Sequence, residues 1–185
     1  MSIPPAFLAT ATEAVLRAGE IQLSYFGRGV RVKKKGVIDL VTEADLAVEE
    51  MFRDLINSRF PSHLVLAGEQ YKGDAIKDSQ EFRWIFDPID GTTNFAHDLP
   101  IYCSSLALEA AGRLEVAAVY DPTRRELFTA ERGGGAFLNG IPLKVSTSEQ
   151  LVDSVLSTGF PYDVHDTIDD VVGLFAKFTG QVRAV

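Results

Sequence analysis

Two aspartates in a turn-forming stretch have the most informative spacing in this sequence. Asp87 and Asp90 follow the apolar run Trp84–Phe86, with Pro88 between them and Gly91 directly after them. Carboxylate and backbone carbonyl oxygens are ligands that suit a hard cation such as Mg²⁺. Proline ends a strand and glycine permits the close approach of a ligand. We therefore expect a metal site where a short buried strand ends at Asp87.

Two threonines add hydrogen-bond donors at the same place. Thr92 and Thr93 are expected to cap a short helix whose free N–H groups face the carboxylates, and such amides bind phosphate. The alternative is an Asp-Pro turn followed by an Asp-Gly turn, in which both acids only cap backbone groups. For an arbitrary pattern of this kind the two interpretations are equally balanced. The full string from Trp84 to Phe95 is far more specific.

Two further carboxylates and a basic run are weaker candidates by themselves. Asp45 follows Thr42 at capping-box spacing, so helix capping alone explains it. Glu69 follows the apolar stretch His63–Ala67, and sites often form where strands end, although a surface glutamate is the more ordinary interpretation. The run Lys33–Lys35 is typical of a solvated edge, or it supplies one lysine to the metal or phosphate region.

The apolar pattern predicts helices and short strands around these candidates. Helices are expected over Phe7–Phe26, with Ile21 or Gln22 on the buried face, from Thr42 to about Arg59, and over Asp163–Phe178. Strands are expected over Val30–Lys34, His63–Ala67, Trp84–Asp87, Ile101–Ala110, Glu115–Tyr120, Glu126–Glu131 and Val155–Phe160. Turn signals at Gly112, Asp121-Pro122 and Asn139-Gly140 imply short connections, so this part of the sheet should be antiparallel.

Composition restricts the class of protein. The chain has 185 residues, of which 46% are hydrophobic, so we expect a globular chain with a sizeable core. Its net charge of −8 argues against nonspecific binding to nucleic acid or to an anionic membrane. We find no apolar run of membrane-spanning length. A single cysteine, Cys103, excludes an internal disulfide and fits a reducing cytoplasm. His63, His97 and His165 lack a mutual ligand spacing and are interpreted as surface or capping residues.

The ordered motifs together resemble the inositol monophosphatase family. The most specific motif is Asp87-Pro88-Ile89-Asp90-Gly91-Thr92-Thr93-Asn94-Phe95. Its companions are Asp39-Leu40-Val41-Thr42 with Asp45, Gly68-Glu69, Tyr120-Asp121-Pro122, Glu126-Leu127-Phe128, Arg132-Gly133-Gly134-Gly135-Ala136, Leu138-Asn139-Gly140 and Thr158-Gly159-Phe160-Pro161-Tyr162. The resemblance runs from the first helix to Val185.

This resemblance implies an α+β fold, a layered α/β/α/β/α sandwich whose first half is a mainly antiparallel sheet flanked by helices. The chain would be that half, a single N-terminal metal-binding domain over residues 1–185. The family's second half, which carries a further metal-binding aspartate in a Trp-Asp pair, has no counterpart here. Since Val185 falls inside an expected element, the sequence is also expected to be a fragment of a longer enzyme.

The same resemblance assigns roles to individual residues. It implies that Glu69, Asp87 and the carbonyl of Ile89 bind a first Mg²⁺, and that Asp87 and Asp90 hold a second. Glu69 also counts among the catalytic residues. One lysine of the basic run, Lys34 or Lys35 depending on register, would lie near this site.

The phosphate contacts and the water follow from the same resemblance. Asp90, Gly91 and Thr92 would meet the phosphate, Gly91 and Thr92 through backbone N–H groups. Thr92 would orient the attacking water, with support from Asp45.

The implied reaction is Mg²⁺-dependent hydrolysis of a phosphate monoester by a metal-activated water, with myo-inositol monophosphate as the leading substrate. Related sugar-phosphate, histidinol-phosphate and phosphonucleotide phosphatases share the motif and stay open as alternatives. A different class is a truncated noncatalytic homologue that binds metal or partners. A homodimer is implied by the family alone.

Overall fold

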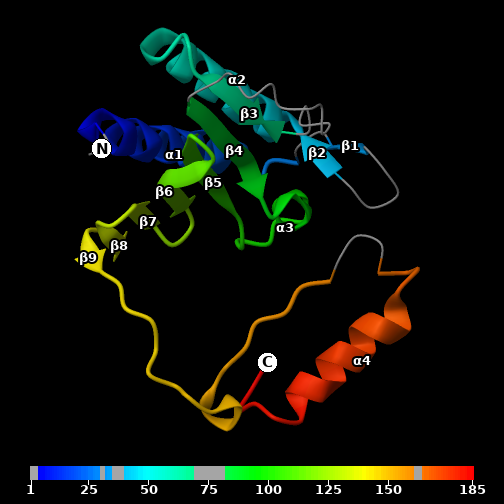
Figure 1. Ribbon diagram of the computed structural model, residues 1–185. Coiled ribbons are helices and arrows are strands. Elements are labelled where there is room, and N and C mark those ends of the chain that lie inside the picture. Colours follow the sequence, from blue (N-terminus) through cyan, green and yellow to red (C-terminus); the bar gives the residue numbers. More distant parts are fainter. Residues whose placement is uncertain (1–3, 30–31, 35–39, 69–81, 161–163) are drawn as a thin grey trace. The chain divides into compact units, whose positions relative to one another are not determined.

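The computed structural model describes residues 4–29, 32–34, 40–68, 82–160 and 164–185, with only the backbone described for 32–34 (Figure 1). The chain divides into two compact units, Met1–Leu143 and Lys144–Val185. Within the described residues, no helix is both long and apolar enough to cross a membrane.

The first unit contains helices and two sheets. Its helices are α1 (Pro5–Tyr25), α2 (Glu43–Arg59) and α3 (Thr92–Ala96). Its strands are β1 (Val32–Lys34), β2 (Leu40–Thr42), β3 (Leu64–Ala67), β4 (Phe82–Asp90), β5 (Cys103–Ala110), β6 (Arg113–Asp121), β7 (Glu126–Glu131), β8 (Gly135–Leu138) and β9 (Ile141–Pro142). Strands β1 and β2 form an antiparallel pair, and β3 to β9 follow one another in a seven-stranded sheet. Only the β3–β4 pair in that sheet is parallel. The predicted α+β class and the mainly antiparallel sheet are confirmed.

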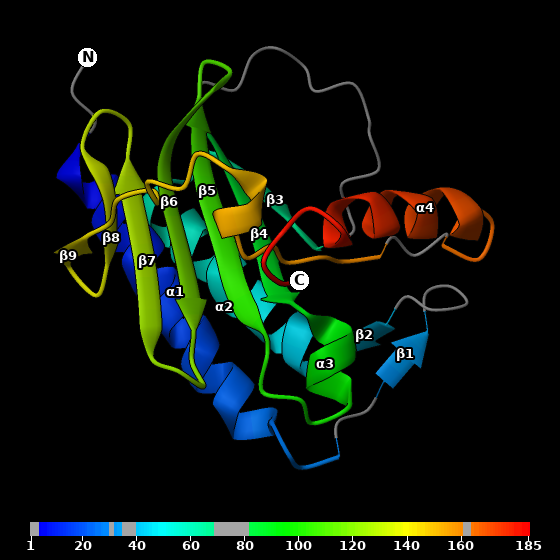
Figure 2. The ribbon, with the colours of Figure 1, turned by 90° about the horizontal axis from the view of Figure 1, so that it is seen from below.

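Helices α1 and α2 cover one face of the larger sheet (Figure 2). Alternation along β4 and β5 points Trp84, Phe86, Leu106 and Leu108 to this face, where each is at most 3% exposed. They pack against the helix residues Phe7, Ala11, Ala14, Val15, Ala18, Val48, Phe52, Leu55 and Ile56. Full burial of one large apolar side chain contributes roughly 1.5–3 kcal/mol. The core therefore fixes β4, which carries the predicted site.

The hairpin between β8 and β9 has the predicted turn. Asn139 and Gly140 have φ values of 49° and 79°, as a type I′ turn requires at both central positions. Asn139 Oδ1 also accepts a hydrogen bond of 2.9 Å from the backbone N–H of Leu127, which ties the hairpin to β7.

Strand β4 is longer than predicted. It continues past Asp87 to Asp90, so the expectation that Pro88 ends the strand was wrong. The register between β4 and β5 shifts between these two aspartates. Pro88 lies inside the shifted stretch, where its missing N–H removes no hydrogen bond of the ladder.

His63 is also placed differently from the prediction. It is half-buried, and its Nδ1 accepts a hydrogen bond of 3.0 Å from Trp84 Nε1. Its ring stacks on that of Phe60, with centroids 4.8 Å apart. The ring is half-buried because it packs against aromatic neighbours. The spacing of the histidines in the sequence does not reveal these contacts. The predictions for the other two histidines are confirmed, since His97 is the exposed C-cap of α3 and His165 is exposed.

The second unit contains η2 (Leu151–Asp153) and α4 (Ile168–Thr179). The strand predicted over Val155–Phe160 is wrong, because within the described part of this unit only one isolated bridge, Val155 to Ala184, forms. Helix α4 begins at Ile168, later than the predicted Asp163, which is outside the described residues. No residue of α4 is buried, since so short a unit has little apolar surface to cover it.

Candidate active site

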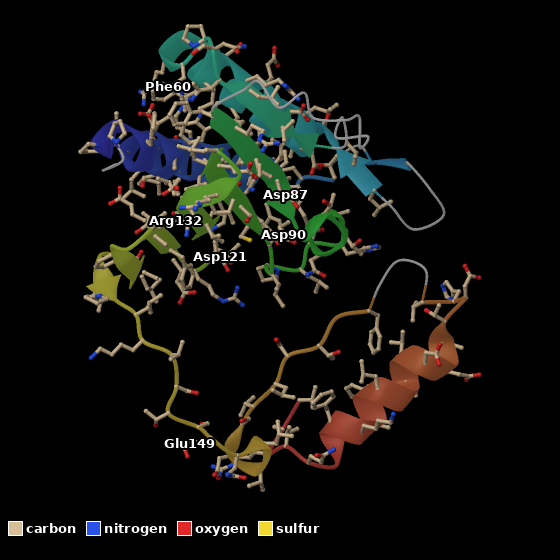
Figure 3. All side chains as sticks on the ribbon, viewed as in Figure 1. Phe60, Asp87, Asp90, Asp121, Arg132 and Glu149 are labelled. Carbon is tan, nitrogen blue, oxygen red and sulfur yellow. The ribbon has the colours of Figure 1, made fainter. Side chains whose placement is uncertain are left out.

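Asp87 and Asp90 lie on the same face of the sheet. In a regular strand, residues three apart point to opposite faces. Here the register moves from Asp87 opposite Ser105 to Asp90 opposite Cys103, so three steps along β4 match two along β5. The extra residue forms a β-bulge. It turns both carboxylates away from the helices, and both side chains are exposed (Figure 3).

The chain turns sharply after Asp90. Gly91 has φ +100° and is the N-cap of α3, with no side-chain cap. The prediction that Thr92 and Thr93 cap this helix was therefore wrong, because both are already helical residues. Instead, Thr92 Oγ1 donates a hydrogen bond of 2.9 Å to the carbonyl oxygen of Ile89. The Thr92 hydroxyl and the Ile89 carbonyl are thus held together beside the two aspartates.

A second apolar cluster lies under this turn. It joins Ala44 of α2, Ile89 of β4, Phe95 of α3 and Tyr102, with Tyr25 and Phe26 from the end of α1 packed against it. The ring centroids of Phe95 and Tyr102 lie 4.9 Å apart. The ends of α1 and β4, the start of α2 and helix α3 therefore meet beneath the candidate residues.

Asp45 lies at the start of α2, where β2 leads into the helix. Its Oδ2 accepts hydrogen bonds from the backbone N–H of Thr42, at 2.8 Å, and from Thr42 Oγ1, at 2.6 Å. The predicted capping box is confirmed. Helix α3, which begins with Thr92, packs against β2 (Figure 2). The role of Asp45 in supporting Thr92 stays a prediction.

Glu69 lies outside the described residues, as do Lys35 and the side chains of Lys33 and Lys34. Gly68, the residue before Glu69, is described and has φ +61°. A Cβ atom at Gly68 would lie 2.5 Å from Glu49 Oε2. Arg53 binds Glu49 Oε1 at 2.7 Å and donates to the carbonyl of Ala67 at 3.3 Å. Helix α2 thus holds the end of β3, the strand parallel to β4.

Cys103 lies close to the aspartates, although no spacing pattern singled it out. Burial, and then the charges of Asp90, Asp87 and Asp121, raise the pKa of its thiol to about 11. Burial, and then the charge of Asp121, raise the pKa of Tyr102 to about 12. Cys103 begins β5 and Tyr102 directly precedes it, so the charges of the carboxylates act on groups of a neighbouring strand and of the segment that leads into it.

Asp121 is predicted from the sequence as a turn residue and as part of a family motif, but without a role in the site. It ends β6, and the antiparallel meander brings that end beside the start of β5. Burial raises its pKa, but hydrogen bonds from the side chain and backbone of Thr123 and of Arg124 outweigh burial, so the pKa is lowered overall. Figure 3 shows it on the same side as the two site aspartates. Only the strand pairing, and no local motif, could have revealed this neighbour.

A cavity of about 360 Å³ opens beside the turn. Asp90 and Asn94 line it from the turn, and Cys103, Asp121 and Phe128 line it from the sheet. Cavities of about 600 Å³ along α1 and α2 contain none of the candidate residues. The cavity beside the turn is therefore the one of these three that predicted site residues, Asp90 and Gly91, line.

The donor set fits a hard divalent cation. Asp87 and Asp90 present two exposed carboxylates on one face, and the Ile89 carbonyl has a second lone pair beyond the one that Thr92 uses. Mg²⁺ typically uses one or two protein carboxylates together with waters and substrate phosphate. Among the described residues, no three His, Cys, Asp or Glu side chains are grouped to hold a metal. The third predicted carboxylate, Glu69, is outside them.

Comparison with known proteins identifies relatives along most of the chain. An inositol monophosphatase from Dictyostelium discoideum is 42% identical over 161 residues, which are 86% of this chain and 59% of that protein. The Nus factor SuhB of Salmonella typhimurium is 38% identical over 172 residues, which are 92% of this chain and 64% of that protein. The chain therefore spans about 60% of the length of these relatives.

Solved structures agree with these sequence matches. The extragenic suppressor protein SuhB of Bartonella henselae superposes with a TM-score of 0.87 at 32% identity, covering 97% of this chain and 69% of that one. Another solved structure, an IMPase/NADP phosphatase at 30% identity with a TM-score of 0.73, is complexed with Mg²⁺ and phosphate and covers 91% of this chain and 61% of that one. The sequence model described as the inositol monophosphatase family matches residues 5–184. By this match over nearly its whole length, the chain belongs to the inositol monophosphatase family.

Proposed function

We propose that this chain contributes the metal and phosphate site of a Mg²⁺-dependent phosphatase that hydrolyses a phosphate monoester, with myo-inositol monophosphate as the leading substrate. The observation that supports this most strongly is the bulge that turns Asp87 and Asp90 to one face, directly before the Gly91 turn. Family membership supports phosphatase chemistry in general. A related structure complexed with Mg²⁺ and phosphate supports the choice of ion.

In this proposal Glu69, Asp87 and the carbonyl of Ile89 would hold one Mg²⁺, and Asp87 and Asp90 would hold a second. When bound, Mg²⁺ supplies positive charge that stabilises the phosphoryl oxygens and lowers the pKa of water towards neutrality. Asp90 also contacts the phosphate. The negative charge of the two aspartates suits a divalent cation, so the occupied site would accept an anionic substrate that the carboxylates alone would repel.

The turn after Asp90 positions the phosphate and the nucleophile. Backbone N–H groups of Gly91 and Thr92 donate to phosphoryl oxygens and stabilise the charge that develops there. The hydroxyl of Thr92 donates to Ile89 O at 2.9 Å, which leaves its oxygen lone pairs to accept a hydrogen bond from the attacking water. Asp45, at the start of α2, supports Thr92. The water then attacks phosphorus in line, without a phosphoenzyme.

A noncatalytic role is the second candidate. It is favoured by the 38% identity to a protein described as a Nus factor. Related sugar-phosphate, histidinol-phosphate and phosphonucleotide phosphatases are alternatives within the enzyme class. We also propose that residues 1–185 form the N-terminal part of a longer enzyme, because the chain spans only about 60% of its relatives. A homodimer and a cytoplasmic location stay predictions.

The test is Mg²⁺-dependent phosphate release by the full natural protein, from myo-inositol monophosphate and from the alternative phosphate esters. Replacing Asp90 by Asn should reduce turnover about a hundredfold or more, the scale of removing a group that stabilises transition-state charge. Asp98→Asn is the matched control, because Asp98 is exposed just beyond α3; it should stay within about twofold.

Near-normal turnover by Asp90→Asn would show that the metal assignment is wrong. No release from any ester by the wild-type protein would favour the noncatalytic role.

A further inference from the structure

The carbonyl oxygen of Pro88 lies at the centre of the bulge and accepts two side-chain hydrogen bonds. Gln22 Nε2 donates to it at 2.7 Å, and Ser104 Oγ donates to it at 2.9 Å. Gln22 Nε2 also contacts Ser104 Oγ at 2.9 Å. Because a carbonyl oxygen has two lone pairs, these two donors use its full accepting capacity.

The bulge creates the need for these donors. Asp87 pairs with Ser105 and Asp90 with Cys103, while Pro88 and Ile89 have no register partner on β5. A buried carbonyl that loses its ladder partner must be paired in another way. Gln22, which lies 66 residues earlier in the chain, supplies that pairing from α1.

Gln22 is an unusual residue for its position. It lies in the last turn of α1 and is 0% exposed, as is Ser104. An amide in a core is unfavourable unless it is hydrogen-bonded, so an apolar residue would serve packing alone better. The backbone carbonyl of Gln22 also accepts from Phe26 N, at 2.9 Å, and Phe26 packs on the cluster beneath the site.

We propose that Gln22 is a positioning residue for the metal site, acting through the Pro88 carbonyl. It holds the bulge in the one conformation that places Asp87 and Asp90 on the same face. The proposal rests on the proposed function, in that the two aspartates bind Mg²⁺. Gln22 itself touches neither the ion nor the substrate, so its effect is on the geometry of the ligand pair.

The test is a calorimetric titration of MgCl₂ into the full natural protein and its variants. Gln22→Met nearly preserves side-chain volume and removes the donor. We expect the Mg²⁺ dissociation constant to rise about tenfold, at the low end of the 10- to 100-fold range for partners that orient metal ligands. At saturating Mg²⁺, kcat should stay within about twofold of the wild-type value. Ser104→Ala, which leaves Gln22 as the remaining donor, should weaken binding less.

Val15→Ala is the control for a purely structural role. Val15 is also 0% exposed on α1 but belongs to the other core cluster. It should lower the melting temperature and leave the Mg²⁺ dissociation constant unchanged. An unchanged constant in Gln22→Met, or an equal weakening in Val15→Ala, would overturn the positioning role alone. Absence of Mg²⁺ binding by the wild-type protein would overturn both this role and the proposed function.

Discussion

The backbone of Gly91 lies against the carbonyl oxygen of Ile101, so close that a Cβ atom on Gly91 would be 2.8 Å from that oxygen. The same Cβ would be 3.2 Å from Tyr102 Cα. Gly91 also has φ +100°, a conformation that side chains with a Cβ rarely adopt. The chain segment that precedes β5 therefore closes over the turn that carries the candidate phosphate donors.

We predict that Gly91→Ala lowers the free energy of unfolding by about 2–3 kcal/mol, because backbone strain and a steric clash act together. Urea denaturation measures this. Gly112→Ala is the matched control, since Gly112 has φ +75° but would place its Cβ in open space. It should cost only the backbone strain, about 1 kcal/mol. Equal losses in the two variants would contradict the close approach to Ile101.

Local rules were enough for the helix start and for the hairpins. The spacing of Thr42 and Asp45 predicted the capping box, and Asn139-Gly140 predicted its turn, because each depends on residues within four positions. The bulge in β4 could not be predicted in this way. Local rules predict that the strand ends before Pro88, whereas it continues because its pairing with β5 shifts around the proline.

Gln22, which binds the Pro88 carbonyl in the bulge, could not be predicted by local rules either. Periodicity alone predicts either Ile21 or Gln22 on the buried face of α1. The structure buries Gln22 completely, since its amide reaches Pro88 and Ser104 across 66 and 82 positions of sequence. Asp121 was missed likewise, as its position near the site depends on strand order. Pairs at such separations arise from the tertiary fold, and a single sequence gives no local sign of them.

The hydrogen bond between Trp84 and His63 leads to a second stability prediction. Trp84 is 0% exposed, so His63→Leu would leave its buried indole N–H without its 3.0 Å acceptor. It would also remove the ring stacked on Phe60. We expect a loss of about 1–3 kcal/mol in the free energy of unfolding, measured by urea denaturation. His97→Leu, at an exposed position, should change it by about 0.5 kcal/mol or less. Similar values for the two variants would argue against the buried bond.

The thiol of Cys103 should react slowly with iodoacetamide. Burial, followed by the charges of the three nearby aspartates, raises its pKa to about 11, so at pH 8 only about one thiol in a thousand is ionised. A free cysteine, with pKa about 8.5, is roughly one quarter ionised at that pH. We expect alkylation at least about a hundredfold slower than for a free thiol, rising with pH towards 11.

The control for accessibility is a second thiol at an exposed position, Ser148→Cys in a Cys103→Ser background. It should react at the rate of a small thiol. Asp90→Asn should accelerate the reaction of Cys103, because it removes the second-ranked cause of the raised pKa. Fast alkylation of Cys103 at pH 8 in the wild-type protein would contradict the placement of the thiol among these carboxylates.

Asp121 should make stability depend on pH in the acid range. Burial alone would raise its pKa, but hydrogen bonds from Thr123 and Arg124 lower it overall. Since the folded-state pKa lies below the unfolded value of about 3.9, the carboxylate stabilises the fold above that pH. This contribution is lost as the pH falls through the folded-state pKa.

We therefore predict that Asp121→Asn is less stable than the wild type by about 1–2 kcal/mol at pH 7, the scale of hydrogen bonds to a charged group. The difference should shrink steadily below about pH 4. Thermal unfolding of both proteins between pH 7 and pH 3 measures it. Asp98→Asn should give no such trend, because Asp98 is exposed. A difference that grows towards acid pH would mean that burial, and not the hydrogen bonds, dominates at Asp121.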